Sequence, residues 1–428
     1  MKGFFLSLMF NVLLAPVTFS QAAPDQIAMS CIHTPMLFLQ GNQNGYPIID
    51  VGAVSALELH FDDLDGYIKN YYYTYQLCDA NWQPVNVSPF DYLKGFTQNR
   101  ISQYRVASLA KTKYVHYQAL LPESSCIPIK SGNYLLKVYL NGDTSNLAFT
   151  KRLLVVDNFV NISARILQPF NQEVFNTDQK VQFTLDVSKL RILNQQQQLK
   201  VVVLQNYRWD NAITGMQPQF MRQNLYEYNG ERDFLFPAGK EYRWLDLRSF
   251  RFESDRVRSV DVSTVPFTVE VAPDGERTQQ RYLYYADGNG FYQIGSTDVS
   301  NAWWQGDYAN VHFSFVPRDP SLYNGKNVYI AGQMTGYLYN DSTRMIFNPA
   351  SGAFEKTLML KEGYYTYTYV TRDAANPDAP PSFELTDGNY WETENNYTIL
   401  VYYRSFSDRS DELVGITNID SRTSRTGF

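Results

Sequence analysis

Apolar and polar residues alternate along most of the chain. Between residues 57 and 62, leucine or phenylalanine alternates with glutamate, histidine or aspartate, and tyrosine or leucine fills every second position from 71 to 77. A period of two places one set of side chains on each face of a β-strand. The same rhythm predicts strands over 114–121, 134–140, 148–156, 181–187, 199–205, 267–271, 281–285, 311–316, 328–331, 355–360, 364–370 and 398–403.

Turn signals separate these segments, and no stretch keeps a helical period over three turns. Asn-Gly, Ser-Gly or Asp-Gly pairs stand at 131–132, 141–142, 229–230, 287–288 and 387–388. Short strands separated by frequent turns are typical of antiparallel sandwiches. We therefore predict an all-β protein of three consecutive β-sandwich domains of the immunoglobulin-like or early-set kind.

Two breaks divide the chain into domains. A predicted strand ends at 155–158, and the polar sequence Val-Ala-Pro-Asp-Gly-Glu occupies 271–276. Proline and glycine in a polar stretch favour a turn or a linker. The predicted domains are 32–157, 158–275 and 276–418 in series, followed by a loose tail at 419–428.

The first residues have the pattern of an export signal. Lys2 is followed by a largely apolar run from Phe4 to Val17, and Ser20-Gln21-Ala22 carries small residues where a signal peptidase reads them. We expect residues 1–22 to be a signal peptide cleaved near Ala22, which places the mature chain in an exported, oxidising compartment. No apolar run after residue 20 reaches the length of about 20 residues that a membrane helix needs.

The composition of the chain argues against several classes of function. The chain has 33 Tyr, 27 Phe and 6 Trp against 4 His and 3 Cys, and its net charge is −6. This aromatic content argues against disorder, and the acidic balance argues against a nucleic-acid partner. The common zinc, nucleophile-elbow and phosphate-loop motifs are missing, so we expect no enzyme activity and no cofactor or metal site.

Two features of the predicted first domain leave alternatives open. Cys78 and Cys126 could form one disulfide bond, or remain free buried thiols, with Cys31 left over. The acidic run at 62–65 has enough carboxylates to suggest calcium, but it lacks the ligand spacing of a known calcium loop. A turn that ends a strand is the simpler interpretation.

A long aromatic connection is the main candidate for a binding surface. It runs from Trp82 to Ile101, and aromatic rings in such a loop either contact a partner or pack over the end of the sandwich. The candidate partner-binding residues are Trp82, Phe90, Tyr92, Phe96 and Asn99.

Several motifs resemble the type IX secretion system plug proteins of the Bacteroidota. For the N-terminal domain of that family, the motifs are FDDL at 61–64, YQLCDANW at 75–82, DYLKGFTQNRI at 91–101 and SGNYLLKVY at 131–139. Two later blocks, GKEYRWLDLRS at 239–249 and TENNYTILVYYR at 393–404, resemble its middle domain and its end. Leu77 stands where the family usually has His, and Lys240 and Tyr242 stand where it has Asn and Phe.

The resemblance implies a periplasmic protein associated with the outer membrane. Its partner would be the outer-membrane barrel translocon of the secretion system, whose periplasmic end the family is understood to seal. A rigid rod of sandwiches that presents aromatic loops is compatible with this role.

A second resemblance points to a different class of function. The segments at 327–337 and 360–369 are similar to early-set modules that bind starch-like glycans. Such modules stack sugars on exposed aromatic side chains, for which Tyr337 and Tyr339 are the candidates here. An exported glycan-binding protein is therefore the alternative.

Overall fold

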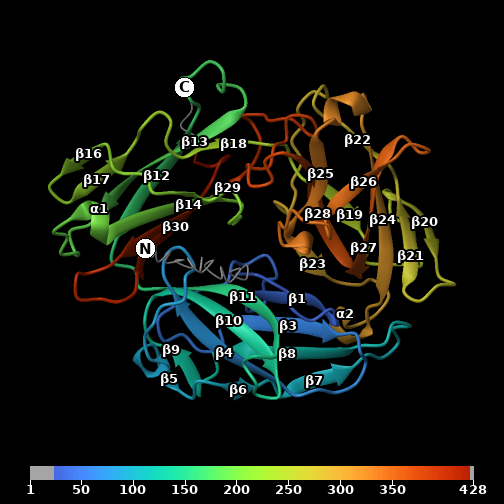
Figure 1. Cartoon of the computed structure of the whole chain (residues 1–428), viewed down its shortest axis with the longest axis horizontal. Coiled ribbons are helices and arrows are strands. Elements are labelled where there is room, and N and C mark those ends of the chain that lie inside the picture. The colour runs from blue at the N-terminus through green and yellow to red at the C-terminus, as the bar shows by residue number, and fades with distance from the viewer. Residues whose placement is uncertain (1–23, 425–428) are drawn as a thin grey trace, which may run out of the picture.

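The chain folds almost entirely into β-structure. A computed structural model describes residues 24–424, and its two α-helices, α1 (Gln195–Gln198) and α2 (Ala302–Gln305), are single turns (Figure 1). The all-β prediction is confirmed. The predicted signal peptide lies outside the described residues. Across 24–424 no helix has the length and the apolar character needed to cross a membrane.

The first lobe, residues 32–157, is a sandwich of two main sheets with a short two-stranded sheet beside them. Its strands are β1 (Ile32–Leu39), β2 (Ile48–Asp50), β3 (Leu57–Asp63), β4 (Tyr71–Cys78), β5 (Leu93–Gly95), β6 (Asn99–Arg100), β7 (Gln103–Val106), β8 (Val115–Leu121), β9 (Cys126–Pro128), β10 (Gly132–Leu140) and β11 (Leu147–Val156). One sheet has the order β1-β3-β8-β7, the other β2-β11-β10-β4-β6, and β5 pairs with β9.

Alternation along the strands builds the core of this lobe. In β4 the side chains of Tyr71, Tyr73 and Tyr75 are buried, and the residues between them are half-buried. Leu59 and Phe61 of β3 meet them from the other sheet. Burial of each such side chain contributes about 1.5–3 kcal/mol, which makes the lobe's core a large stabilising term.

The second lobe is built from two distant parts of the chain, residues 158–237 and 396–424. Its strands are β12 (Asn161–Leu167), β13 (Asp178–Asp186), β14 (Leu199–Gln205), β15 (Ile213–Thr214), β16 (Phe220–Arg222), β17 (Leu225–Tyr228), β18 (Leu235–Pro237), β29 (Asn396–Tyr403) and β30 (Glu412–Asp420). One sheet has the order β12-β13-β17-β16 with β18 against β13, and the other has the order β15-β14-β29-β30. β14 and β29 are antiparallel, with Leu199 opposite Tyr403 and Gln205 opposite Tyr397.

The third lobe, residues 243–388, contains a sheet that curls over its own core. Its strands are β19 (Arg243–Asp246), β20 (Val257–Asp261), β21 (Phe267–Val271), β22 (Asp274–Gly275), β23 (Tyr292–Ile294), β24 (Tyr308–Val316), β25 (Lys326–Ala331), β26 (Arg344–Asn348), β27 (Ala353–Lys361) and β28 (Gly363–Asp373). The order is β19-β28-β25-β26-β27-β24-β21-β20, with β22 against β24 and β23 against β28. Phe313 of β24 and Tyr367 of β28 meet edge to face across the core, with ring centroids 5.2 Å apart.

The lobes do not follow the predicted boundary at 275. β19 to β22 lie before that boundary but belong to the third lobe, and β29 and β30 lie after it but complete the second. The polar stretch at 271–276 is no linker, because Asp274 is buried and bonded to Arg243, Arg256 and Tyr367. Pro273 and Gly275 suggested a turn or a linker at this position. The ion pairs with Arg243 and Arg256 instead hold Asp274 in the interior.

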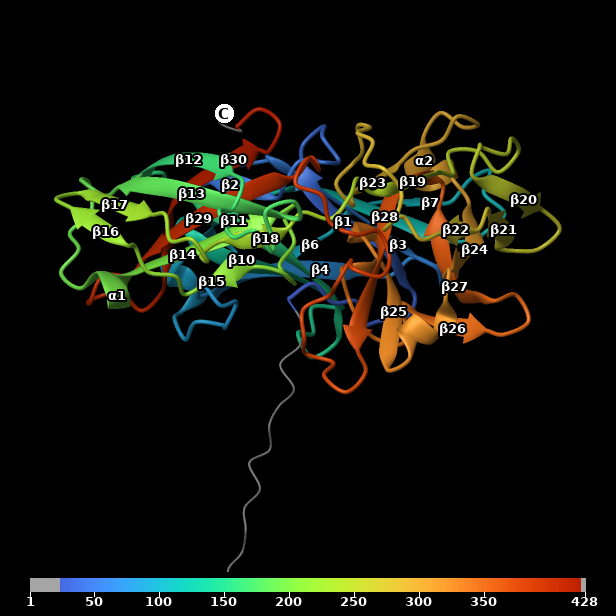
Figure 2. The ribbon, with the colours of Figure 1, turned by 90° about the horizontal axis from the view of Figure 1, so that it is seen from above.

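The three lobes meet around a common centre instead of forming a rod. In Figure 1 the first lobe lies below, the second at the upper left and the third at the right. Figure 2, seen from above, places the second and third lobes at opposite ends of the molecule. The predicted tail also differs in part, since β30 extends to Asp420 and Ser421 is buried. Residues 425–428 lie outside the described part.

Candidate functional site

Three of the five candidate residues in the aromatic connection are used inside the molecule. Trp82 is buried, and its ring meets the edge of Trp209 in the second lobe at a centroid distance of 4.9 Å. The guanidinium of Arg152 lies 5.2 Å from the centre of the Trp82 ring. Trp82 therefore fastens the first lobe to the second.

Tyr92 and Asn99 belong to the core of the first lobe. The Tyr92 hydroxyl donates to the carbonyl oxygen of Tyr75 at 3.3 Å. The side-chain amide of Asn99 donates to Ser125 Oγ at 2.7 Å and to the Tyr73 hydroxyl at 3.2 Å. These contacts hold the connection against the sandwich.

Phe90 and Phe96 are the candidate residues that face solvent. Their exposed fractions are 73% and 68%. Phe96 is held by its neighbour Gly95, whose φ is +99° and which has no room for a Cβ beside the Ser125 carbonyl oxygen. The backbone N–H of Phe96 donates to that same oxygen at 2.6 Å. Phe90 precedes β5 and Phe96 lies between β5 and β6 in the sequence, and these two strands lie at the edge of the first lobe farthest from the other two lobes (Figure 1).

A buried ion pair joins the first lobe to the third. Asp62 of β3 pairs with Lys361 of β27, and their exposed fractions are 1% and 0%. Asp62 also accepts from the Tyr308 hydroxyl at 2.6 Å. Burial by itself raises the pKa of Asp62, but Lys361 and His116 outweigh burial and hold that pKa below its ordinary value.

Two histidines extend this network toward the surface. His116 Nδ1 lies 2.7 Å from Asp62 Oδ1, His116 Nε2 lies 3.0 Å from His60 Nδ1, and His60 Nε2 lies 3.2 Å from Glu58 Oε2. Burial lowers the pKa of His116 to about 4, so this ring is neutral near pH 7.

Sequence reasoning missed this network. In the alternating pattern, Glu58, His60 and Asp62 form the polar face of β3, and nothing in the pattern shows that another lobe covers it. The third lobe covers that face instead, and Trp303 stacks on His60 with ring centroids 4.0 Å apart. The one feature of the sequence that could have indicated the network is the presence of histidine and aspartate on the same face of β3.

The neighbouring acidic turn is paired with a cation of the protein itself. Cys31, Asp63 and Asp65 present ligand atoms within 4.8 Å of one another. Lys69 forms ion pairs with both carboxylates, at 2.9 Å to Asp63 and closer to Asp65. The ammonium group supplies the positive charge, in agreement with a turn that ends a strand.

The described cysteines form no disulfide bond. Cys31, Cys78 and Cys126 are all free, and Cys78 and Cys126 are buried. The pairing of Cys78 with Cys126 is therefore not found. Burial raises the pKa of both thiols to about 12, which keeps them protonated and unreactive.

Tyr337 and Tyr339, the candidates for glycan stacking, lie between the second and third lobes. Arg208 lies over the Tyr337 ring, 4.9 Å from its centre. The Tyr339 hydroxyl donates to Asp210 Oδ2 at 2.8 Å, and Asp210 pairs with Arg208 at 2.6 Å. Both rings are half-buried and held by the second lobe, so neither is an open platform for a sugar.

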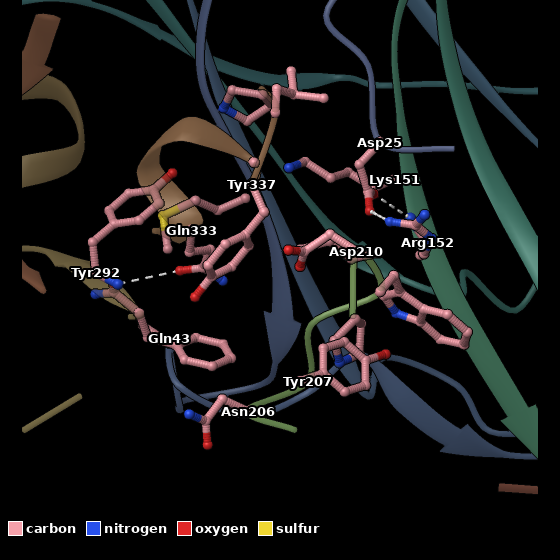
Figure 3. Close-up of a pocket in the computed structure, with 18 of the residues that line it drawn as sticks. Asp25, Gln43, Lys151, Arg152, Asn206, Tyr207, Asp210, Tyr292, Gln333 and Tyr337 are labelled. Atoms are coloured by element: carbon pink, nitrogen blue, oxygen red, sulfur yellow. Dashed lines mark hydrogen bonds and ion pairs between the residues drawn. The ribbon is translucent and has the colours of Figure 1, made fainter. Parts of the chain in front are cut away.

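A cavity of about 280 Å³ lies where the three lobes meet. The first lobe contributes Lys151 and Arg152, the second Tyr207 and Asp210, and the third Gln333 together with other side chains (Figure 3). The segment at 24–26, which precedes the first lobe, runs along β11 beside this cavity, and Asp25 pairs with Arg152. Sequence reasoning did not identify this cavity, because its walls come from segments about 300 residues apart.

Comparison with known proteins finds similarity for the first lobe and for the chain as a whole. Residues 32–157 match the family model described as "Type 9 secretion system plug protein 1st domain", and this range coincides with the first lobe. No curated protein matches the chain. A crystal structure of a hypothetical protein from Parabacteroides merdae is similar over 92% of this chain and 98% of its own, with 29% sequence identity and a TM-score of 0.87. Residues 32–157 of this chain are therefore similar to the first domain of the type IX secretion system plug proteins, as the motifs at 61–139 indicated.

Proposed function

We propose that the protein is a non-enzymatic, periplasmic component of the type IX secretion system. In this proposal it associates with the outer-membrane barrel translocon and seals its periplasmic end. The observation that carries the proposal is the match of residues 32–157 to the plug family's first domain. The match suggests association with the secretion machinery, and the sealing role is the further step that we propose.

The form of the molecule supports this role. A seal must keep its shape against an opening, and the three lobes are fixed to one another by buried contacts instead of by flexible linkers. Asp62 with Lys361 joins the first and third lobes, and an apolar cluster that includes Leu154, Leu204 and Tyr402 joins the first and second.

The exposed rings supply a docking surface of modest size. Phe90 and Phe96 stand on the free edge of the first lobe, where no other lobe covers them. Aromatic anchors within a polar surround are typical of specific interfaces that can also dissociate. A seal that must open to cargo needs such reversible contact.

The glycan-binding alternative is not favoured. The two tyrosines that it requires are engaged by Arg208 and Asp210 of the second lobe.

Co-purification from the native host tests the proposal. The tagged protein is expected to bring down the barrel translocon, and Phe90→Ala with Phe96→Ala is expected to weaken that recovery. Phe170→Ala with Phe252→Ala is the matched control, because those rings are equally exposed, at 78% and 76%, on the other two lobes. Failure to recover the translocon, together with retention on immobilised soluble polysaccharide, would reject the proposal in favour of the alternative.

Membrane permeability tests the sealing step separately. A strain that lacks this protein is expected to admit large hydrophilic dyes or antibiotics while still secreting protein. Unchanged permeability, in a strain whose translocon also lacks its other periplasmic occupants, would contradict sealing even if the association were real.

A further inference from the structure

The cavity between the lobes contains a cation that has no partner. Lys151 lies on β11, and within residues 24–424 its ammonium group has no hydrogen bond or ion pair. The ammonium group points into the space between the lobes (Figure 3). Unpaired charges in low-dielectric surroundings are costly, so a protein that keeps one commonly uses it.

The two carboxylates in the cavity wall are already committed to other cations. Asp25 accepts from both the backbone N–H and the guanidinium of Arg152. Asp210 is held by Arg208 and by the Tyr339 hydroxyl. Each acid therefore has an arginine of its own, and the positive charge of Lys151 is left over.

A second donor faces the same space. The Gln333 side-chain oxygen accepts from the backbone N–H of Tyr292 at 3.2 Å, which fixes the orientation of the amide. Among the described residues, nothing accepts from its Nε2 hydrogens. Lys151 and Gln333 also line an adjoining cavity of about 460 Å³ between the first and third lobes, so both donors lie where the two spaces meet.

The remaining wall is largely apolar and includes several aromatic rings. Tyr207 and Trp209 come from the second lobe, and Phe291 and Tyr292 come from the third. Ring faces and edges of this kind favour a flat, apolar ligand body. A volume of about 280 Å³ is close to the lower end of small-ligand pockets, which matches a compact molecule.

We propose that this junction binds a small organic anion, a carboxylate on a planar apolar body, with Lys151 and Gln333 holding the carboxylate and the aromatic wall holding the body. The ligand would touch all three lobes at once. Its binding would therefore stabilise their mutual arrangement, which is a property separate from contact with the translocon. Burial lowers the pKa of the Lys151 ammonium, and a bound carboxylate would oppose that effect.

Calorimetric titration of the purified, full mature chain with benzoate and indole-3-acetate tests the proposal, with benzamide as the uncharged counterpart. Saturable binding of at least one carboxylate is expected, with benzamide weaker by about tenfold or more, because a charge-assisted contact is lost. Lys151→Gln is expected to abolish the preference for the anion, and Lys151→Arg to retain it. Lys326→Gln, at an exposed position of β25, is expected to leave binding unchanged.

Thermal unfolding separates this role from a structural one. Without ligand, Lys151→Gln is expected to unfold at the same temperature as the wild type or higher, because an unpaired, half-buried charge is removed. Benzoate or indole-3-acetate is expected to raise the unfolding temperature of the wild type but not of Lys151→Gln. Binding of none of the probes, equal binding of benzoate and benzamide, or equal binding of the carboxylates by Lys151→Gln and the wild type would each overturn the proposal.

Discussion

Asp62 and Lys361 form a buried ion pair although 299 positions separate them in the sequence. The pair lies between the first and third lobes, with Tyr308 and His116 completing the hydrogen bonds of the carboxylate. Loss of one partner leaves an unpaired charge in the interior, which costs about 3–5 kcal/mol. The position of the third lobe on the first therefore depends on both residues.

Lys361→Met is expected to lower the free energy of unfolding by about 3–5 kcal/mol, because Asp62 is then buried without its cation. Asp62→Asn combined with Lys361→Met is expected to cost less than Lys361→Met alone, since no net charge remains in the interior. Urea denaturation followed by tryptophan fluorescence measures both. Lys326→Met, on an exposed side chain of the same lobe, serves as the control. Equal effects of the buried and the exposed substitution would show that the pair does not support the interface.

Stability is expected to fall as the pH is lowered through the range in which histidine titrates. Burial lowers the pKa of His116 to about 4 from its ordinary 6.5, so between these values the unfolded chain binds a proton that the folded chain does not. The contribution of His116 is fully present above about pH 6.5 and is lost as the pH falls toward 4, by up to about 3 kcal/mol. Denaturation at a series of pH values measures it.

His116→Gln is expected to flatten that dependence, whereas His312→Gln, at a half-buried position on β24, is expected to leave it unchanged. A slope that survives His116→Gln would assign the pH dependence to other groups.

Gly95→Ala is expected to disturb the exposed edge of the first lobe. The new Cβ would collide with the Ser125 carbonyl oxygen, in addition to the strain of a positive φ. Gly52→Ala provides the matched control, because Gly52 has a φ of +79° with nothing within 4 Å of a new Cβ. The strain of a left-handed backbone alone costs about 1–2 kcal/mol, and Gly95→Ala is expected to exceed that cost. Translocon recovery should fall for Gly95→Ala only, and an equal loss for both variants would argue against a role for the Phe96 position.

Fragments of the chain test the lobe boundaries. Residues 158–275 are expected to remain unfolded, because they lack β29 and β30 and carry β19, β21 and β22 without β28 and β24, with which these strands pair. A fusion of 158–237 to 396–424 is expected to give a folded domain with a cooperative thermal transition. Circular dichroism and one-dimensional proton NMR distinguish the two results. A folded fragment 158–275 would support the boundaries that the sequence alone suggested.

Most of the β-strands could be predicted from the sequence, because alternation is a local property and the burial of β4 follows it residue by residue. The order of the strands could not. Nothing in the alternation of β14 shows that its neighbour is β29, about 190 residues further on. The burial of polar residues such as Asp62 and Asp274 could not be predicted either, because the cations that pair with them inside, Lys361 and Arg243, come from other segments of the chain.

The sequence also could not show which candidate binding residues are buried and which are exposed. All five candidate residues of the aromatic connection were plausible as contact residues, yet the sequence does not distinguish an inward ring from an outward one. Tyr92 and Phe96 are both aromatic and only four positions apart, and one is buried while the other is exposed. Gly95 lies between them at a positive φ and close to Ser125, a long-range contact that the sequence does not show.

The split second lobe has a consequence for the order in which the protein matures. Domains of a growing chain tend to fold from the N-terminus onward. The first lobe has its whole core within 32–157, and the third has nearly all of its core within 243–388, so each can form once its own segment is available. The edge of β14 that pairs with β29 stays unpaired until β29 is synthesised, and β29 is synthesised only after the entire third lobe. The second lobe is therefore the last to close, and its closure is the step at which the three-lobed assembly becomes complete.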